Sequence, residues 1–405
     1  MALKLIVYKL KRLWHFFKTG LLQGLSAQLR YRFPERKLKI LSITGTDGKT
    51  TSNTLLYHLL KSAGKKVGLL TTVAAYIGEE KIDTGFHVTA PQPKDLYKFM
   101  RRLVNEGYEY LILETTSHGL YQYRPWAIKP QVAGLTNITH EHLDYHLTYH
   151  EYLRAKAILF KHSKLSILNS DDDSYSALKK ILKNKQTDFY HPKEKINRLI
   201  LTAIKDRFAQ AYNQLNARLV AKMALTQGLT PKQIADAIRT FPPIPGRMEF
   251  INSKRRFEIV VDFAHTPNGL KQALLSLKEQ MKRQSKAGRL IALFGCAGLR
   301  DFSKRPLMGK FGSEIADLCI FTSEDPRTED VWSIINQMKA GVEANHHKII
   351  SLADRKEAIK FALNKLAKPG DVVGFFGKGH EQSLCIGKVE YPWDEIKVII
   401  EALAS

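Results

Sequence analysis

From Leu38 to the C-terminus, short runs of β-branched and aliphatic residues alternate with stretches that have the apolar periodicity of helices. Parallel strands require a crossover between them, and the crossover is usually a helix, so this alternation is typical of βαβ units. The sequence therefore predicts an α/β fold with mostly parallel sheets. The predicted strands lie within LKILSITG, KVGLL, YEYLILE, VAGLTNI and LSILN, and later within FEIVVDFAH, RLIALFGC, LCIFTSED and DVVGFFGKGH.

One segment interrupts this alternation. PPIPGRMEF, near residue 245, is rich in proline and contains a glycine, which indicates a link between two domains. At roughly 100–200 residues per domain, a chain of 405 residues accommodates both. We expect a central domain over residues 38–245 and a C-terminal Rossmann-like α/β domain over residues 246–405, preceded by a separate segment, residues 1–37.

Residues 3–17 predict a basic amphipathic helix. Leu3, Ile6, Val7, Leu10, Leu13, Trp14 and Phe17 have helical spacing, while Lys4, Lys11, Arg12, His15 and Lys18 fall mostly on other faces. No acidic residue precedes Glu35. Two interpretations stay open, because residues 1–18 could contact an anionic membrane surface or could pack on the main body. No apolar run approaches the roughly 20 residues of a membrane-spanning helix.

The balance of charges is strongly basic. Lys and Arg number 63 and Asp and Glu 39, which gives a net charge of +24. Such a surface suits nucleic acid, anionic lipid or a polyanionic substrate, so a nucleic-acid-binding ATPase is one alternative. The cysteines Cys296, Cys319 and Cys385 have no CxxC spacing, which predicts neither a zinc ribbon nor a disulfide framework and fits a reducing cytoplasm.

A phosphate-binding loop is predicted at GTDGKTT. It follows an apolar strand and precedes a helix over about residues 50–62, so backbone N–H groups and the helix N-terminus can face phosphate oxygens. Lys49 would reach the terminal phosphates, and the Thr50 hydroxyl would ligate Mg²⁺. We therefore expect the central domain to be a P-loop-type ATPase. Its ATP-binding loop residues are Gly45, Thr46, Asp47, Gly48, Lys49, Thr50 and Thr51.

Further candidate metal ligands follow this loop. Glu114 ends a predicted strand of the same sheet, where a carboxylate suits Mg²⁺. A later segment contains His140, His142, Asp144, His146 and His150. That segment mixes a loop with a helix and lacks both HExxH and cysteine, which disfavours zinc and favours a single histidine serving a hard metal. In isolation, Lys156 reads as a surface lysine.

Polar residues also end the predicted strands of the second domain, where open parallel sheets bind ligands. Asp262 and His265 end one strand, and an aspartate there can accept hydrogen bonds from ribose hydroxyls. Arg327 offers a guanidinium that suits a carboxylate. GKGHE offers Gly377, Gly379 and Glu381, whose backbone and carboxylate could hold an amine.

Taken together, these segments resemble the Mur ligases, which are ATP-dependent amide ligases that add amino acids to peptidoglycan precursors. GTDGKTT, ETTSHGL, TNITHEHLDYH, YLRAKAILF, PGRME, DFAHTPNGL, GCAGLRDFSKRPLMG, SEDPR and GKGHE occur in that family's order. The resemblance runs from about Leu38 to the C-terminus and is greatest to the MurE group, which adds the third residue of the stem peptide. It implies an ADP-forming acid–amino-acid ligase that works through an acyl phosphate.

The resemblance also implies roles for individual residues. The catalytic residues would be Lys49, Glu114, His142 and Lys156; Glu114 and His142 would bind Mg²⁺, and a carbamylated Lys156 would hold a second Mg²⁺. Besides the loop, Asn213, Asn216, Arg247, Asp262 and His265 would contact ATP. Thr89, Thr116, Gln122 and Arg124 would hold the muramyl-peptide acceptor, and Arg300, Asp325, Arg327, Gly377 and Glu381 the incoming amino acid.

Three departures from the family pattern bear on the substrates. The Asp-Asn-Pro-Arg pattern for meso-diaminopimelate is Glu-Asp-Pro-Arg here, with Asp325 in place of the asparagine, although Arg327 still favours diaminopimelate over lysine. Ala90 replaces the second threonine of the acceptor loop. The family's UDP-gripping N-terminal domain does not fit into the residues before Leu38, so we expect either that other surfaces hold the UDP or that the acceptor is lipid-linked or otherwise not UDP-linked.

A folylpolyglutamate synthetase-like ligase is a further alternative, because it shares the core and lacks the UDP-binding domain, although SEDPR and GKGHE point away from it. We expect a cytoplasmic monomer whose partners are a muramyl-peptide acceptor and a free amino acid, with no nucleic acid.

Overall fold

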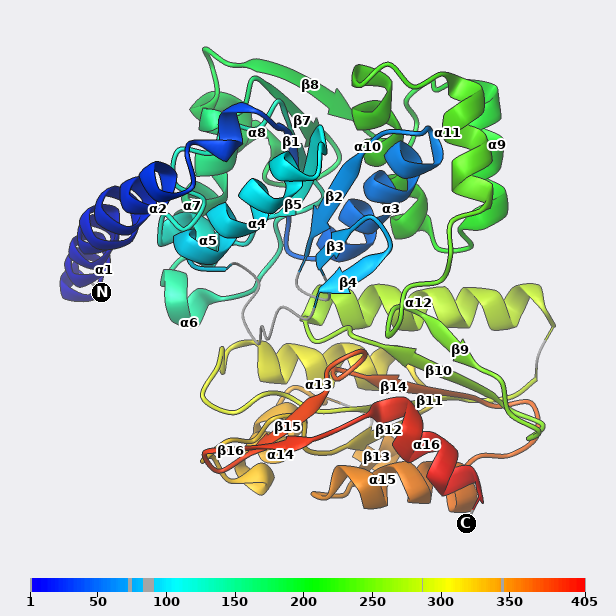
Figure 1. The fold of residues 1–405 in the computed structure, drawn as a ribbon. Coiled ribbons are helices and arrows are strands. Elements are labelled where there is room, and N and C mark those ends of the chain that lie inside the picture. Colours follow the sequence, from blue (N-terminus) through cyan, green and yellow to red (C-terminus); the bar gives the residue numbers. More distant parts are fainter. Residues whose placement is uncertain (1, 72–74, 83–90, 286, 344–345, 405) are drawn as a thin grey trace. The chain divides into compact units, whose positions relative to one another are not determined.

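The computed structural model describes residues 2–71, 75–82, 91–285, 287–343 and 346–404 (Figure 1). The contacts within the chain divide it into two units. The first unit comprises residues 1–139 and 146–241, and the second comprises residues 140–145 and 242–405. Each unit is described by itself below. The predicted domain boundaries at residues 37 and 245 are a different division of the chain and stay predictions.

The first unit is built on an eight-stranded sheet. The strand order is β4 (Glu80–Ile82), β3 (Ala75–Ile77), β2 (Val67–Leu70), β5 (Tyr110–Glu114), β1 (Lys39–Thr44), β6 (Val132–Leu135), β7 (Leu165–Asn169) and β8 (Gln186–Tyr190). The pairs from β2 to β8 are parallel, whereas β3 and β4 add antiparallel strands at one edge. Because β1 lies inside the sheet, the loop that follows it has neighbouring strand ends on both sides.

Helices surround this sheet, and those that lie next to it bury its apolar strands. They are α3 (Lys49–Ser62), α4 (Pro93–Asn105), α5 (Ser117–Tyr121), α7 (Tyr149–His162), α8 (Tyr175–Ile181), α9 (Arg198–Arg207), α10 (Ala211–Thr226) and α11 (Pro231–Arg239). The short helix α6 (Leu143–His146) contains residues of both units. Their ends follow from the sequence: Thr148 caps α7 by accepting from Glu151 N–H, and Thr230 and Gln233 form a capping box at α11.

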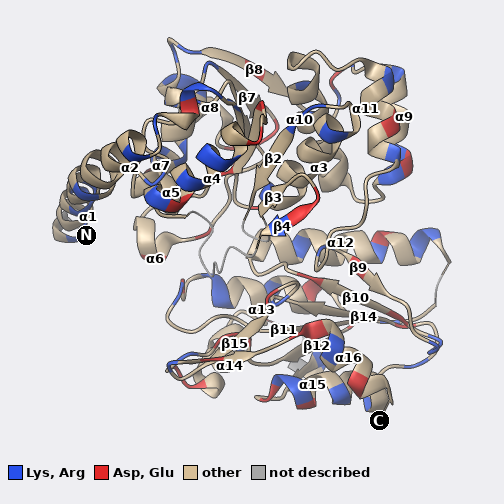
Figure 2. Ribbon diagram, viewed as in Figure 1, with Lys and Arg blue, Asp and Glu red and all other residues tan. Residues whose placement is uncertain are grey.

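A long helical segment precedes β1. It consists of α1 (Ala2–His15), the π-helical stretch η1 (Phe16–Gly24) and α2 (Leu25–Arg30), followed by the short turn η2 (Pro34–Arg36). The helical segment is therefore longer than the predicted residues 3–17. Figure 2 shows Lys and Arg but neither Asp nor Glu on α1. Among the helices that the structure describes, none has the length and hydropathy to span a bilayer.

The second unit contains a six-stranded sheet and a β-ribbon. The sheet order is β13 (Ile349–Ser351), β12 (Leu318–Phe321), β11 (Leu290–Phe294), β14 (Val372–Phe376), β10 (Glu258–Asp262) and β9 (Glu249–Ile251), with only β9 antiparallel, and the ribbon pairs β15 (Ser383–Ile386) with β16 (Val389–Pro392). The helical elements are α12 (Pro267–Arg283), α13 (Lys304–Ile315), α14 (Val331–Lys339), η3 (His346–Lys348), α15 (Arg355–Phe361), η4 (Ala362–Leu366) and α16 (Glu395–Ala404).

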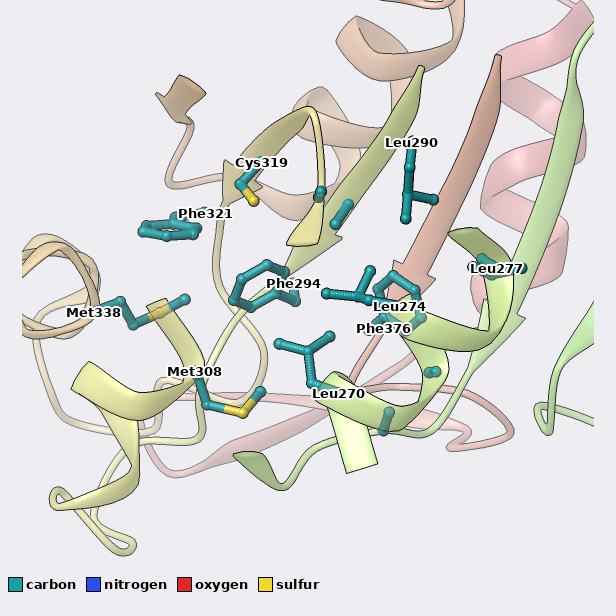
Figure 3. Packing of buried hydrophobic residues seen from close by; sticks show 14 of the residues in the cluster. Leu270, Leu274, Leu277, Leu290, Phe294, Met308, Cys319, Phe321, Met338 and Phe376 are labelled. Carbon is teal, nitrogen blue, oxygen red and sulfur yellow. The ribbon is translucent and has the colours of Figure 1, made fainter. Parts of the chain in front are cut away.

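Two apolar cores lie on the two faces of this second sheet. On one face, Leu270 and Leu274 of α12 and Met308 of α13 gather around Phe294 of β11 (Figure 3). On the other face, residues of α15, η4 and α16 pack against the same strands. This helix–sheet–helix layering confirms the predicted Rossmann-like class, and the mostly parallel sheet of the first unit confirms the predicted α/β fold.

Candidate active site

The predicted phosphate loop, residues 45–48, joins β1 to α3. Helix α3 begins at Lys49, one residue before the predicted start. Gly48 has φ +77°, and a Cβ there would lie 2.5 Å from Asn216 Nδ2, so the buried asparagine and the left-handed turn both require glycine. Lys49 Nζ donates to Thr46 O at 2.7 Å. The loop thus has the strand–turn–helix form that presents backbone N–H groups at a helix N-terminus.

The loop is also held from the end of β6. Asp47 N–H donates to Asn137 Oδ1 at 3.0 Å, and Thr136 Oγ1 donates to Asp47 O at 2.7 Å. The Thr46 and Tyr152 hydroxyls lie 3.0 Å apart. These bonds fix the loop backbone before any ligand binds. Sequence reasoning missed Asn137 and Tyr152, because neither belongs to a phosphate-binding motif.

Two candidate Mg²⁺ ligands meet beside this loop. The parallel pairing of β1 with β5 sets Ile43 opposite Glu114, and Thr50 Oγ1 donates to Glu114 Oε2 at 3.0 Å. A hydroxyl and a carboxylate oxygen this close are oxygen donors of the kind that Mg²⁺ takes, so the residues present fit such an ion. Within the described residues, however, no group of three or more His, Cys, Asp or Glu side chains is arranged to hold a metal.

Lys156 is buried, so its reading from the isolated sequence as a surface lysine is wrong. It lies on α7, where its Nζ donates to Gly45 O at 2.5 Å and lies 4.7 Å from the Tyr152 ring centroid. Burial, followed by the nearby Lys49 ammonium, lowers the Lys156 pKa well below 10.5. A lowered pKa increases the fraction of neutral amine, which is the form that can react with carbon dioxide to give a carbamate.

Two of the four candidate acceptor residues line a pocket at the end of β5. Glu114, Thr116 and Arg124 are among its lining residues, together with Leu113, Gly119 and Pro125. Thr116 caps α5 by accepting from Gly119 N–H, and Arg124 Nε donates to Gln122 Oε1 at 2.8 Å. Thr89 and Ala90 lie outside the described residues. The pocket therefore joins one candidate metal ligand to two of the candidate acceptor contacts.

The histidine-rich segment is divided between the units. His140, His142 and Asp144 belong to the second unit, where His140 Nε2 lies 2.9 Å from Ser303 Oγ and His142 Nδ1 lies 3.7 Å from Glu141 Oε1. His146 belongs to the first unit and is fully buried, and burial lowers its pKa to about 2. His150 is exposed on α7. His142 remains a predicted ligand.

The remaining ATP candidates are spread over both units. Asn213 lies on α10 with Asn216, and its Nδ2 lies 3.2 Å from Gln210 Oε1. In the second unit, both carboxylate oxygens of Asp262 accept backbone N–H groups, one from Met248 at 2.6 Å and one from Ala264 at 2.8 Å. These two bonds show how Asp262 shapes the loops around the end of β10.

The neighbours of Asp262 complete this group. The Arg247 guanidinium lies 4.5 Å from the Phe263 ring centroid, and His265 lies beside the same ring, with 4.4 Å between centroids. Arg247, Asp262 and His265 thus gather at one end of β10. Asp262 and His265 do so because they lie at and just beyond the carboxyl end of that strand, whereas Arg247 comes from the segment before β9.

The candidate amino-acid-binding residues lie in the second unit. Arg327 has φ +53°, its N–H donates to Cys385 O at 3.0 Å and its Nη1 donates to Gly298 O at 2.6 Å. Gly377 has φ +103°, and a Cβ there would lie 2.6 Å from Glu324 Oε2. Burial raises the pKa of Glu324 to about 7. Arg300 is exposed.

Lys378 lies beside two of these candidate residues, and its sequence position inside GKGHE did not predict a role for it. Its side chain is fully buried, and its Nζ donates to Asp325 Oδ1 at 2.9 Å and to Glu381 Oε2 at 2.6 Å. Asp325 Oδ1 also accepts from Cys385 N–H at 3.0 Å. The acidic residue that replaces the family's asparagine is therefore matched by an ammonium group.

Comparisons with known proteins fit this geometry. A family model described as "Mur ligase middle domain" matches residues 43–216, and one described as "Mur ligase, glutamate ligase domain" matches residues 246–379. The chain is similar to the UDP-N-acetylmuramoyl-L-alanyl-D-glutamate--2,6-diaminopimelate ligase 1 of Clostridium acetobutylicum, with 36% identity over 391 residues that cover 92% of this chain and 79% of that protein.

The corresponding ligase of Clostridium botulinum is 38% identical over 394 residues, with 92% of this chain and 79% of that protein covered. A solved structure of a UDP-N-acetylmuramoyl-L-alanyl-D-glutamate--2,6-diaminopimelate ligase aligns with a TM-score of 0.59 and 27% identity, over 94% of this chain and 82% of that one.

Proposed function

This chain belongs to the Mur ligase family, and from that membership we propose that it joins meso-diaminopimelate to a muramyl-dipeptide precursor at the expense of ATP. Two relatives at 36% and 38% identity carry the name of that reaction. The observation that carries the reaction class is the meeting of Lys49, Thr50, Glu114 and Lys156 around one loop of the first unit. A loop of this form, with cationic and oxygen donors, suits phosphoryl transfer.

The proposed chemistry has two steps. First, a carboxylate oxygen of the acceptor attacks the γ-phosphorus of ATP, and the bond from that phosphorus to the bridging oxygen breaks, which leaves an acyl phosphate and ADP. Second, the neutral amine of the amino acid attacks the acyl carbon, inorganic phosphate leaves, and the nitrogen loses a proton as the amide forms. Each step needs alignment and neutralisation of negative charge more than covalent help from the protein.

The residues of the loop supply these requirements. Backbone N–H groups at the start of α3 bind phosphate oxygens, and the Lys49 ammonium neutralises charge that develops on them. Thr50 and Glu114 would hold Mg²⁺, which when bound screens the phosphate charges. Breaking the bond between Lys49 Nζ and Thr46 O frees the ammonium for this task.

Lys156 would act as a carbamate that holds a second Mg²⁺, and His142 stays a further predicted metal ligand. Its burial and lowered pKa support this role, since a protonated ammonium cannot add carbon dioxide. The carbamate would place a negative charge where α7 otherwise carries an amine. Its bond to Gly45 O would then be lost and the loop would be free to take up phosphate.

The candidate amino-acid-binding residues support diaminopimelate as the substrate. Arg327 offers a guanidinium for the distal carboxylate, and Glu381 a carboxylate for the distal ammonium. Because Lys378 neutralises Asp325, the acidic replacement does not present an uncompensated charge to that carboxylate. A lysine substrate lacks the distal carboxylate and would leave Arg327 without this bond.

We also propose the compartment, the oligomeric state and the partners of the enzyme. We place the reaction in the cytoplasm, in a monomer with no nucleic-acid partner, and with peripheral contact of residues 1–18 with an anionic membrane. A lipid-linked rather than UDP-linked acceptor is the second candidate, and the exposed apolar side chains of α1 favour it.

The test offers ATP, one acceptor and a panel of amino acids, and measures ADP release and product masses. UDP-linked muramyl dipeptide and its lipid-linked counterpart are the two acceptors. We expect product with diaminopimelate and little with lysine, and we expect Lys49→Ala to suppress ADP release while amino-acid binding persists. Turnover by Lys49→Ala near the wild-type rate would refute the proposed phosphate site. Activity on neither acceptor would refute the proposed substrate.

A further inference from the structure

The N-terminal helical segment is fixed to the first unit by one of its sides. Tyr8 is buried, its hydroxyl lies 2.8 Å from His146 Nδ1, and its carbonyl accepts from the Tyr121 hydroxyl. Arg12 Nε donates to the Tyr123 hydroxyl at 3.2 Å. These contacts turn the Tyr8 side of α1 toward the first unit, so the side opposite Tyr8 faces away from it.

Farther along, the segment packs closely on Trp126. A Cβ on Gly20 would lie 2.6 Å from Trp126 Cε3, and one on Gly24 would lie 2.5 Å from Trp126 Cγ. Both glycines are buried, as are Ala27 and Gln28 of α2. The attached side therefore continues from Tyr8 to Gln28.

The π-helical stretch keeps this side in line. Gly24 follows Tyr8 by 24 − 8 = 16 residues, which is about 4.4 turns of 3.6 residues, so an unbroken α-helix would turn Gly24 almost to the opposite side. The wider turns of Phe16–Gly24 use more residues per turn, and Gly24 still faces Trp126. One side of the segment thus faces the unit over its whole length, and the other side faces outward over the same length.

The outward side of α1 is apolar. On a helical wheel it lies opposite Tyr8, and its residues are Leu3, Ile6, Val7, Leu10, Leu13 and Trp14, each between 43% and 75% exposed. The amphipathic pattern that would ordinarily bury an apolar side against the protein is inverted here, because the apolar side is the exposed one.

The same side continues beyond α1. Phe17, Leu21, Leu22, Leu25 and Leu29 are exposed by 37% to 67%. The apolar face therefore spans residues 3–29, and we call it the N-terminal apolar face.

Lysines flank this face. On the same wheel, Lys4 and Lys11 lie along one border and Lys9 along the other, and all three are exposed. Lys18 Nζ lies 4.4 Å from the Trp14 ring centroid. Residues 1–34 contain seven Lys and Arg residues and no Asp or Glu. An apolar face bordered by cations, with tryptophan among its residues, matches the boundary between the acyl chains and anionic headgroups of a bilayer.

We infer that residues 3–29 form an anchor that lies in the plane of an anionic lipid bilayer, with the N-terminal apolar face among the acyl chains and its lysines among the headgroups. A second copy of the chain fits this face less well, because it would bring two sets of lysines together without an acidic residue from either segment. The inference extends the proposed lipid contact from residues 1–18 to residues 3–29 and specifies the side that meets lipid. It does not depend on which acceptor or amino acid the enzyme uses.

The test measures flotation of the full-length protein with vesicles of phosphatidylcholine alone and of phosphatidylcholine with about one third phosphatidylglycerol. We expect binding to the anionic vesicles and little to the neutral ones. Leu10→Gln with Leu22→Gln should abolish it, whereas the same changes at Leu225 and Leu275, which are also exposed leucines, should not.

A second test changes the lysines that border the face, in the triple variant Lys4→Gln, Lys9→Gln and Lys11→Gln. Its matched control is the triple variant Lys282→Gln, Lys365→Gln and Lys388→Gln. Each lysine near the surface contributes about a fivefold factor, so the first variant should bind anionic vesicles roughly a hundredfold more weakly and the control unchanged. Equal flotation with neutral and anionic vesicles would overturn the inference, and so would flotation that persists in both the leucine variant and the lysine variant. So would a dimer in sedimentation that the leucine changes dissolve, without any vesicle binding.

Discussion

Lys378 offers the sharpest test of how this chain accommodates Asp325 among the residues proposed to bind the amino acid. Its ammonium group is fully buried between Asp325 and Glu381. Lys378→Met keeps much of the side-chain volume and leaves both carboxylates without their cation. Removing one partner of a buried ion pair costs about 3–5 kcal/mol of unfolding free energy. We expect about 3 kcal/mol, the lower end, because Asp325 and Glu381 are 17% and 37% exposed and can regain water.

The same change should alter substrate choice. With Asp325 uncompensated, the distal carboxylate of diaminopimelate meets a like charge, and a penalty of about 1.4 kcal/mol would raise its KM about tenfold. The assay compares KM for diaminopimelate and the thermal midpoint in four proteins: wild type, Lys378→Met, Asp325→Asn and the double variant. Asp325→Asn should be mild, since an amide oxygen can still accept from Cys385 N–H.

The double variant tests whether Lys378 compensates the charge of Asp325. Because Asp325→Asn removes the charge that Lys378 neutralises, the double variant should recover most of the KM that Lys378→Met loses. If the two single changes are simply additive, or if Lys378→Met leaves both KM and the thermal midpoint unchanged, the ammonium does not compensate Asp325 and the reasoning fails.

Three further predictions concern other parts of the chain. Lys156 should carry a carbon dioxide adduct that intact-mass spectrometry detects at neutral pH and that acid removes; Lys156→Arg should lack the adduct and the activity, and an active wild type without any adduct would contradict this. Burial raises the Glu324 pKa to about 7, so the folded state binds an extra proton between about pH 4.5 and 7, and the unfolding free energy should fall as pH rises through that window. Glu324→Gln should remove that fall in thermal melts at about pH 5 and pH 8, and an identical fall in the variant would contradict it. Gly24→Ala should cost about 1–3 kcal/mol of stability by crowding Trp126, measured by denaturant unfolding, while Ser26→Ala on the exposed side should be near neutral; equal effects would count against the close packing.

The sequence predicted the elements that are buried and apolar. All nine predicted strands are found, because central strands of parallel sheets are continuous apolar runs. The strands that it missed are short or lie at edges: β16 is exposed at every residue, and β8 is mostly exposed. An edge strand buries little, so its sequence carries no apolar pattern from which it could be predicted.

The candidate site, too, could be predicted only in part. The phosphate loop could be predicted because its residues are consecutive in the chain. The burial of Lys156 could not, since its partner Gly45 is 111 residues away, and the neutralisation of Asp325 depends on Lys378, 53 residues farther along. Of the two interpretations of the N-terminal helix, packing on the main body holds for one side, while the other side is exposed and its contact with a membrane stays a prediction.

The widened turns between Phe16 and Gly24 also limit how the gene for this chain can change. Loss of a single codon there would rotate α1 by roughly a quarter turn relative to α2, which would pull Tyr8 away from His146 or Gly24 away from Trp126. Replacement of a leucine by another apolar residue would leave that register intact. We expect the N-terminal helical segment of related chains to vary far more in composition than in length.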